Sequence, residues 1–108
     1  MRILKFIVNK HTITCDPKSN FSDIAPCTDE ELIADFQFSP EWNGSVKVAA
    51  FYNAQGECPP QELIDGMYCV IPSEAVSGYW FRVQIVGVKD GKLLATNKLD
   101  ILQKGDTK

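Results

Sequence analysis

The sequence predicts an all-β protein, an antiparallel immunoglobulin-like β-sandwich of seven to eight strands. Short runs of strand-forming residues recur along the chain, and turn sequences separate them about every 8–12 residues. The longest run, 79–88 (YWFRVQIVGV), is preceded by a glycine and followed by the tight-turn sequence at 89–92. Ten extended residues span roughly 33 Å, which is enough to cross a small β-domain. We therefore expect this run to be the central strand.

The N-terminal part of the chain is expected to form three strands. The run 4–8 places Leu, Phe and Val side chains on one face, and the Thr-rich run 11–15 returns after a turn. The run 32–38 follows a loop and repeats its apolar residues at every second position until Pro40 ends it. This spacing is the period of a strand and not that of a helix.

The C-terminal part is expected to form the remaining strands. Strands are predicted at 46–52 and 67–71, with a short edge strand at 61–64 after two prolines that cannot donate hydrogen bonds to a sheet. One short helical turn is predicted near 72–77. The final run, 92–102, should pair with the central strand as a hairpin.

Size and charge limit what the protein can be. The 108 residues suit a single β-sandwich domain over 1–102, followed by a polar C-terminal tail at 103–108. The net charge of −3 and the absence of a basic run argue against nucleic acid as a partner. No apolar run approaches the ~20 residues of a membrane helix, and the N-terminus lacks the features of a signal peptide. We expect synthesis in a cytoplasm and no membrane partner.

The cysteines do not form a recognisable metal-binding pattern. They include no C-x-x-C pair, and the chain has only one histidine, so no metal site is expected. A Cys58–Cys69 bridge would close a short loop and contribute about 3 kcal/mol. Without secretion we expect free thiols instead. The four cysteines are Cys15, Cys27, Cys58 and Cys69.

No catalytic constellation is visible. The single histidine, His11, has no identifiable nucleophile or orienting group in the pattern of a catalytic triad. The acidic cluster 29–31 lacks the alternating ligands and central glycine of a Ca²⁺ loop. Gly87 and Gly91 belong to no phosphate-binding motif. We expect a non-enzyme without cofactors.

The central strand carries the candidate contact residues. Because side chains alternate along a strand, Trp80 must point away from the face that holds Tyr79 and Phe81. The outward residues Trp80, Arg82 and Gln84 have the mixed composition of a protein-contact surface. An alternative stays open, in which a loop of the same chain covers Trp80. The expected inward residues are Phe81, Val83, Ile85 and Gly87, and Trp42 is expected to close one end of the sandwich.

Several fragments resemble a known family. They are 36–44 (FQFSPEWNG), 47–51 (KVAAF), 69–76 (CVIPSEAV), 81–87 (FRVQIVG) and 96–97 (TN). In this order and spacing, from about residue 30 to 102, they resemble small β-sandwich proteins and N-terminal domains from the structural modules of tailed phages and prophages of Firmicutes. This family is related to the upper-baseplate-protein N-terminal domain. The chain departs from the pattern in a longer insert at 16–29.

The resemblance implies a non-enzymatic virion component that docks onto other virion proteins. The first expectation is a protein that decorates or reinforces the capsid by docking to the major capsid protein. A homo-oligomer is among the expected partners, and the host bacterial cytoplasm is the expected place of synthesis. A tail or baseplate adaptor is the alternative. A third hypothesis, of another class, is a carbohydrate-binding module in which four aromatic residues form a stacking platform. These residues are Trp42, Tyr52, Tyr79 and Trp80.

Overall fold

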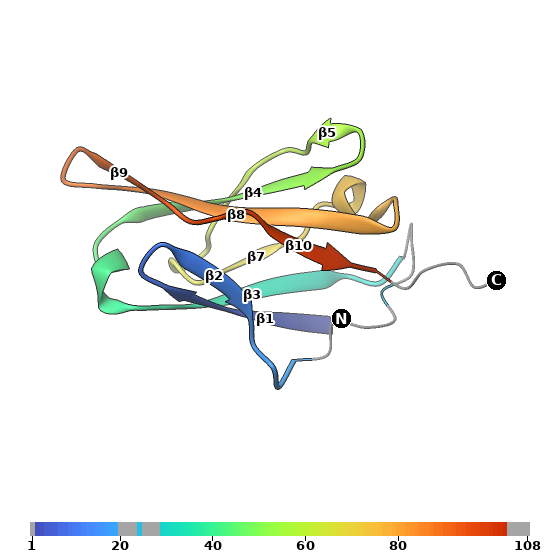
Figure 1. Ribbon diagram of the computed structural model, residues 1–108, viewed down its shortest axis with the longest axis horizontal. Helices are drawn as coiled ribbons and strands as arrows, with labels where there is room; N and C mark the ends of the chain where they lie inside the picture. The colour runs from blue at the N-terminus through green and yellow to red at the C-terminus, as the bar shows by residue number, and fades with distance from the viewer. Residues whose placement is uncertain (1, 20–23, 25–28, 104–108) are drawn as a thin grey trace.

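Two β-sheets pack face to face and form the predicted sandwich in the computed structural model (Figure 1). The structure describes residues 2–19, 24 and 29–103. Sheet A has the strand order β2–β1–β3–β7, with β1 at Arg2–Asn9, β2 at Thr12–Cys15, β3 at Leu32–Phe38 and β7 at Tyr68–Val70. None of the helices in this described part of the chain is long and apolar enough to cross a membrane.

Sheet B is built around the predicted central strand, which is β8. It has the order β10–β8–β4–β5, while β6 also pairs with β4 and β9 with β8. The bounds are β4 Val46–Asn53, β5 Gly56–Glu57, β6 Gln61–Glu62, β8 Trp80–Lys89, β9 Lys92–Ala95 and β10 Leu99–Leu102. The predicted helical turn is the 3₁₀ helix η2, Ser73–Val76, and a second one, η1, occupies Pro40–Trp42 within the predicted turn.

The pairing of β1 with β3 departs from the prediction of a wholly antiparallel sandwich. These two strands run parallel, with Leu4 beside Ala34 and Phe6 beside Phe36. The chain forms the β1–β2 hairpin and then returns to the other side of β1, so β3 starts at the same end as β1. Parallel neighbours require such a long connection, whereas antiparallel ones can be joined by a tight turn. Alternation within β3 is the same in both arrangements, so the sequence pattern does not distinguish them.

The predicted strand 92–102 is interrupted by a bulge. Lys92 to Ala95 pair with β8 in one register, and Leu99 to Leu102 pair in a register shifted by one residue. The intervening residues 96–98 therefore face only two residues of β8, which is the geometry of a β-bulge. The Thr96 hydroxyl accepts a hydrogen bond from the Ile85 N–H at 3.0 Å, and this contact holds the bulge against the central strand.

The bulge also connects the two sheets. The Asn97 side-chain oxygen accepts a hydrogen bond from the Ile13 N–H of β2 at 2.8 Å. The Asn97 N–H in turn donates to the His11 carbonyl at 3.2 Å, and His11 Nδ1 lies 3.3 Å from the Ala95 carbonyl oxygen. A segment that the sequence predicts as plain strand thus ties sheet B to the edge of sheet A.

We expect Asn97→Ala to lower the free energy of unfolding by about 1–3 kcal/mol, because the part-buried Ile13 N–H loses its acceptor. Urea denaturation of the purified protein measures this change. Asn9→Ala, at an exposed strand end, is the matched control and should stay within about 0.5 kcal/mol of wild type. Equal stability of the two variants would contradict the proposed role of the bulge.

The core lies between the sheets and is closed at one end by Trp42. This side chain is 1% exposed, and its Nε1–H donates to the Lys10 carbonyl at 2.7 Å. Gly87 of β8 lies against it, since a Cβ atom there would approach the Trp42 ring to 2.9 Å. The prediction that Trp42 closes the sandwich is confirmed. At the other end of the chain, Gln103 is buried and bonds Tyr79 and Val76, so the domain extends to Gln103 instead of ending at 102.

Candidate functional site

The outer face of sheet B carries the predicted contact residues. Along β8, Phe81, Val83 and Ile85 are fully buried, whereas Trp80 and Arg82 are half-buried on the opposite face. This alternation confirms the predicted assignment of inward and outward residues. The outer face then divides into two halves with different chemistry.

The first half contains both aromatic and charged side chains, and we call it the charged–aromatic half. It comprises Tyr52, Trp80, Arg82, Gln84, Lys98 and Asp100. The strand register places Arg82 between Tyr52 of β4 and Asp100 of β10. Arg82 Nε lies 2.5 Å from Asp100 Oδ1, and the guanidinium lies over the Trp80 ring, 5.4 Å from its centre. Lys98 Nζ lies 4.8 Å from the centre of the Tyr52 ring.

Cations thus lie over both rings of this half. The hydrogen bond from Arg82 lowers the pKa of Asp100, and the same bond raises the pKa of Arg82. Both groups are therefore charged at neutral pH and compensate each other, while Lys98 adds a positive charge. Such an arrangement of ring surface with an ordered cation suits contact with a protein surface that offers carboxylates or carbonyl groups.

Gln84 has a different role from its two neighbours. Its side-chain Nε2 donates to the Thr96 carbonyl at 2.8 Å and so binds the bulge to β8. Gln84 therefore positions the strand that carries Lys98 and Asp100. The sequence analysis did not single out Lys98 and Asp100, because only the register of β10 brings them beside β8.

The structure addresses the alternative in which a loop covers Trp80. The Trp80 ring contacts the Arg82 guanidinium, and the Trp80 side chain remains half-exposed. Tyr79, the preceding residue, is also exposed, but β8 begins only at Trp80, so strand alternation does not assign Tyr79 to either face of sheet B.

The four aromatic residues of the proposed sugar platform do not share a face. Trp42 is buried at the end of the core, and Tyr79 precedes the first residue of β8. Tyr52 and Trp80 lie on the outer face of sheet B, each under a cation. The four-residue stacking platform is therefore wrong.

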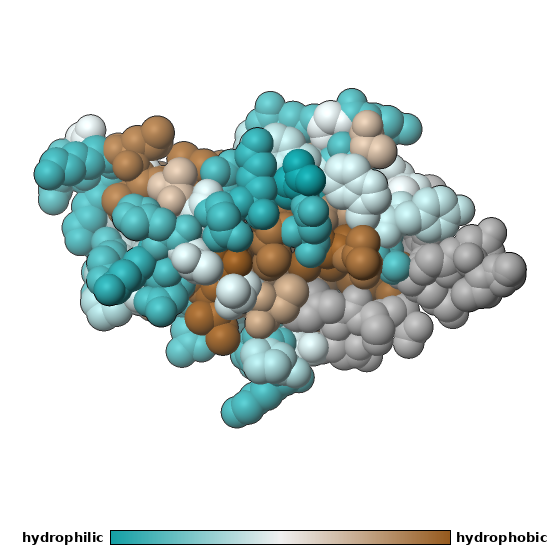
Figure 2. All heavy atoms as spheres, viewed as in Figure 1, coloured by the Kyte–Doolittle hydropathy of each residue, from teal (hydrophilic) through white to brown (hydrophobic). Residues whose placement is uncertain are grey.

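The second half of the face, the aliphatic half, lies toward the β8–β9 hairpin. Strand register aligns its six side chains in two rows that cross three strands. The rows are Leu93–Val88–Val46 and Ala95–Val86–Val48. Leu93 is 72% exposed, Val46 60% and Val88 49%. Figure 2 shows hydrophobic side chains gathered over this hairpin, which Figure 1 labels at β9.

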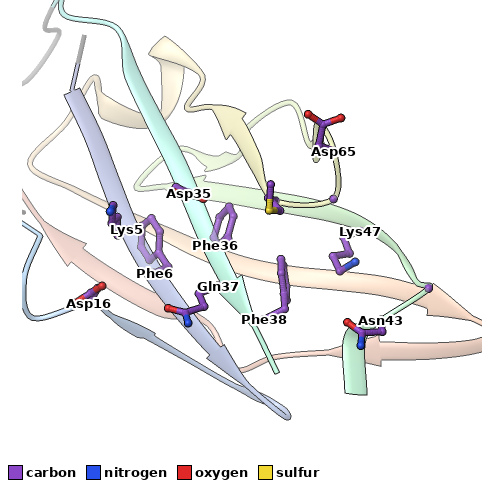
Figure 3. Close-up of a pocket in the computed structure, with 13 residues that line it drawn as sticks. Lys5, Phe6, Asp16, Asp35, Phe36, Gln37, Phe38, Asn43, Lys47 and Asp65 are labelled. Carbon is purple, nitrogen blue, oxygen red and sulfur yellow. The ribbon is translucent and has the colours of Figure 1, made fainter. Parts of the chain in front are cut away.

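A separate groove of about 790 Å³ crosses sheet A and reaches the start of β4 (Figure 3). Lys47 lies at one side of it, with Nζ 5.1 Å from the Phe38 ring centre and 3.3 Å from the Ser45 carbonyl oxygen. Burial, and then the charge of Lys89, lowers the pKa of Lys47. Three carboxylates also line the groove. They belong to Asp16 after β2, Asp35 in β3 and Asp65 before β7. Over residues 2–19, 24 and 29–103, no group of three His, Cys, Asp or Glu side chains could hold a metal ion.

The thiols are held in the protonated form by burial. Cys15, Cys58 and Cys69 are free cysteines, and Cys27 lies outside the described residues. Desolvation raises the pKa of Cys69 to about 12, and it raises the pKa of Cys15 and Cys58 as well. Thiols with raised pKa values are poor nucleophiles at neutral pH, because the thiolate is the reactive form.

A phage domain has the same fold. The structure of the "N-terminal domain of phage TP901-1 ORF48" aligns with a TM-score of 0.65 and 8% sequence identity. The alignment covers 97% of this chain and 100% of that one. No protein-family model matches the chain, and no curated protein matches it in sequence. At 8% identity the likeness shows that the two chains share a fold. This fold therefore occurs in a phage protein.

Proposed function

We propose that the protein is a structural component of a tailed-phage virion, without enzymatic activity, that docks onto other virion proteins. The observation that carries this proposal is the fold shared with the ORF48 N-terminal domain, because the alignment leaves almost no part of either chain outside it. The fragments that resemble phage structural proteins support it from the sequence. Two of those fragments contain residues that hold the sandwich together, Gly87 beneath Trp42 and Asn97 in the bulge.

The charged–aromatic half is the proposed docking surface. Trp and Arg are the residue types that contribute most to protein interfaces, and here each orders the other through a ring–guanidinium contact. The Arg82–Asp100 pair also fixes the guanidinium before binding, which reduces the side-chain entropy lost on docking. The strand beneath them pairs with β10 from Trp80 to Val83 and with β4 from Arg82 to Val88, so Arg82 is held by neighbouring strands on both sides.

Two placements on the virion follow from the sequence analysis. In the first, the protein decorates the capsid by docking to the major capsid protein. In the second, it is a tail or baseplate adaptor. The fold match supports a phage structural protein and is compatible with both placements.

Locating the protein on particles tests the proposal. The particles are those made by the phage or prophage that encodes the chain, and antibody labelling with cryo-electron microscopy would place the protein on them. Label at the tail end supports the adaptor, and label over the shell supports capsid decoration. Purified particles that lack the protein by mass spectrometry would contradict a virion role altogether.

We expect Trp80→Ala to weaken docking to the virion partner by at least about 30-fold, as expected for an interface hot spot of about 2 kcal/mol. Binding of the purified protein to particles assembled without it provides the measurement. Tyr79→Ala is the matched control, since it removes an exposed aromatic ring of the neighbouring residue, which precedes β8. Intact docking by Trp80→Ala, together with a large loss of stability, would show that the ring serves the fold.

A further inference from the structure

The proposed docking surface does not account for the exposed apolar side chains of the aliphatic half. A sandwich usually directs polar side chains from the solvent face of an antiparallel sheet. Here two rows are aliphatic across β9, β8 and β4, and the second row ends beside Glu62 of β6. Their most exposed members are Leu93, Val46 and Val88. Covering these side chains with another apolar surface would remove them from water, which is favourable.

We propose that the aliphatic half binds the same half of a second copy of this chain, across a two-fold axis. The axis would lie between the two facing copies of sheet B and perpendicular to their strands. Along the strands it would lie midway between the Val86 row and the Val88 row. It would place the Val88 row of each copy over the Val86 row of the other. A closed, two-fold contact of this type needs a self-complementary patch. Two aliphatic rows at the spacing of alternate strand residues meet that need.

Charges around the patch agree with this symmetry. Asp90, in the β8–β9 turn, lies two residues beyond Val88. Lys98 precedes Leu99, whose partner is Val83, so Lys98 lies at the level of Gln84, two residues before Val86. The two-fold axis therefore brings Asp90 of each copy toward Lys98 of the other. Both side chains are exposed in the single chain, and Lys98 would leave the Tyr52 ring to reach Asp90 of the other copy.

The size of the patch predicts a weak contact. Its Cα atoms span roughly 7 Å along the strands and roughly 10 Å across them. A stable interface buries about 800 Å² on each partner, which is more than such a patch provides. Association in solution should therefore require high protein concentration. On a particle, neighbouring copies would be held at a high effective concentration, which strengthens a weak contact without new interactions.

The pairing goes beyond virion docking and is independent of it. The offset of the two copies leaves most of each charged–aromatic half outside the overlap, so a pair could still dock through Trp80 and Arg82. The test therefore uses the purified full chain alone. A failed docking experiment would leave the pairing unaffected, and absence of pairing would leave the docking proposal unaffected.

Sedimentation equilibrium over a range of concentrations tests the pairing. The wild-type average mass should rise from that of one chain, 12.1 kDa, toward that of two chains at about millimolar concentration. Val88→Glu should weaken association by at least about tenfold, because the axis places each introduced carboxylate over the Val86 row of the other copy, where it has no partner. Leu93→Glu at the hairpin is the second variant, and circular dichroism melting shows whether each remains folded.

Ile3→Glu is the matched control. Ile3 is 45% exposed and belongs to another aliphatic row, Ile3–Ile33–Val70, on the outer face of sheet A. It should associate as wild type does. The proposal is overturned if the wild type remains a single chain at millimolar concentration. It is equally overturned if Ile3→Glu abolishes association while Val88→Glu and Leu93→Glu retain it.

A double-mutant cycle tests the orientation of the pair. Asp90→Asn and Lys98→Gln should each weaken association roughly three- to tenfold, since the axis creates the ion pair twice. The double variant should be no weaker than either single variant, because both remove the same interaction. Independent, multiplicative effects would overturn the proposed axis.

Discussion

We expect Trp42→Ala to lower the free energy of unfolding by about 3–5 kcal/mol, the range found when a large buried aromatic side chain is removed. Trp42 is 1% exposed and packs against the Phe38 ring at a centroid distance of 5.5 Å. Its loss opens a cavity at the end of the core and leaves the Lys10 carbonyl without its indole donor. Chemical denaturation measures the change, and the midpoint should fall at unchanged slope.

A glycine on β8 sharpens this prediction. Gly87→Ala alone should cost about 1–3 kcal/mol by overpacking, because its Cβ would lie 2.9 Å from the Trp42 ring. In the Trp42→Ala background the same methyl group enters the vacated space, so the two effects should fall short of additivity by about 1 kcal/mol or more. Gly78→Ala has open space around the added atom and should be nearly neutral. Full additivity would contradict the direct contact between Gly87 and Trp42.

Because of Cys69, the stability of the protein should depend on pH in the alkaline range. Burial raises its pKa to about 12 in the folded state, whereas the unfolded thiol has the ordinary value of 9.0. Above pH 9 the unfolded chain releases this proton and the folded chain retains it. The stabilisation from the protonated thiol is therefore complete below pH 9 and is lost as pH rises toward 12. Three pKa units correspond to about 4 kcal/mol.

The measurement compares wild type with Cys69→Ala by urea denaturation between pH 8 and pH 10.5. Other groups also titrate in this range, so the difference between the two proteins is the informative quantity. The wild-type advantage should shrink by about 2 kcal/mol over the interval above pH 9. Cys15→Ala, at a half-buried thiol, is the control and should show a smaller change. Parallel curves for wild type and Cys69→Ala would contradict a buried, protonated Cys69.

Much of the fold could be predicted from local patterns. The alternation of β8 separates Phe81, Val83 and Ile85 from Trp80 and Arg82, and the structure places them on opposite faces as expected. The helical turn after Ile71 was predictable in the same way, since proline and the following polar residues interrupt strand spacing. These features depend on neighbouring residues alone.

The candidate surfaces were less predictable, because they arise from register. Asp100 is an ordinary carboxylate in the sequence, and it becomes the partner of Arg82 only because β10 pairs with β8 after a one-residue shift. Val46, Val88 and Leu93 are each ordinary strand residues. They form one row because β9 returns beside β8 through a tight turn and the distant strand β4 pairs with the other side of β8. The bulge that shifts β10 relative to β9 has no turn sequence to announce it.

Strand alternation along β8, with its inward and outward faces, was determined by the sequence itself, because the two-residue period follows from backbone geometry at each position. Only the tertiary structure decided the parallel pairing of β1 with β3 and the contact of Gly87 with Trp42. It also decided the division of the outer face into two halves. These features depend on which distant segments bury each other's apolar side chains, and no single segment specifies its partner or its register.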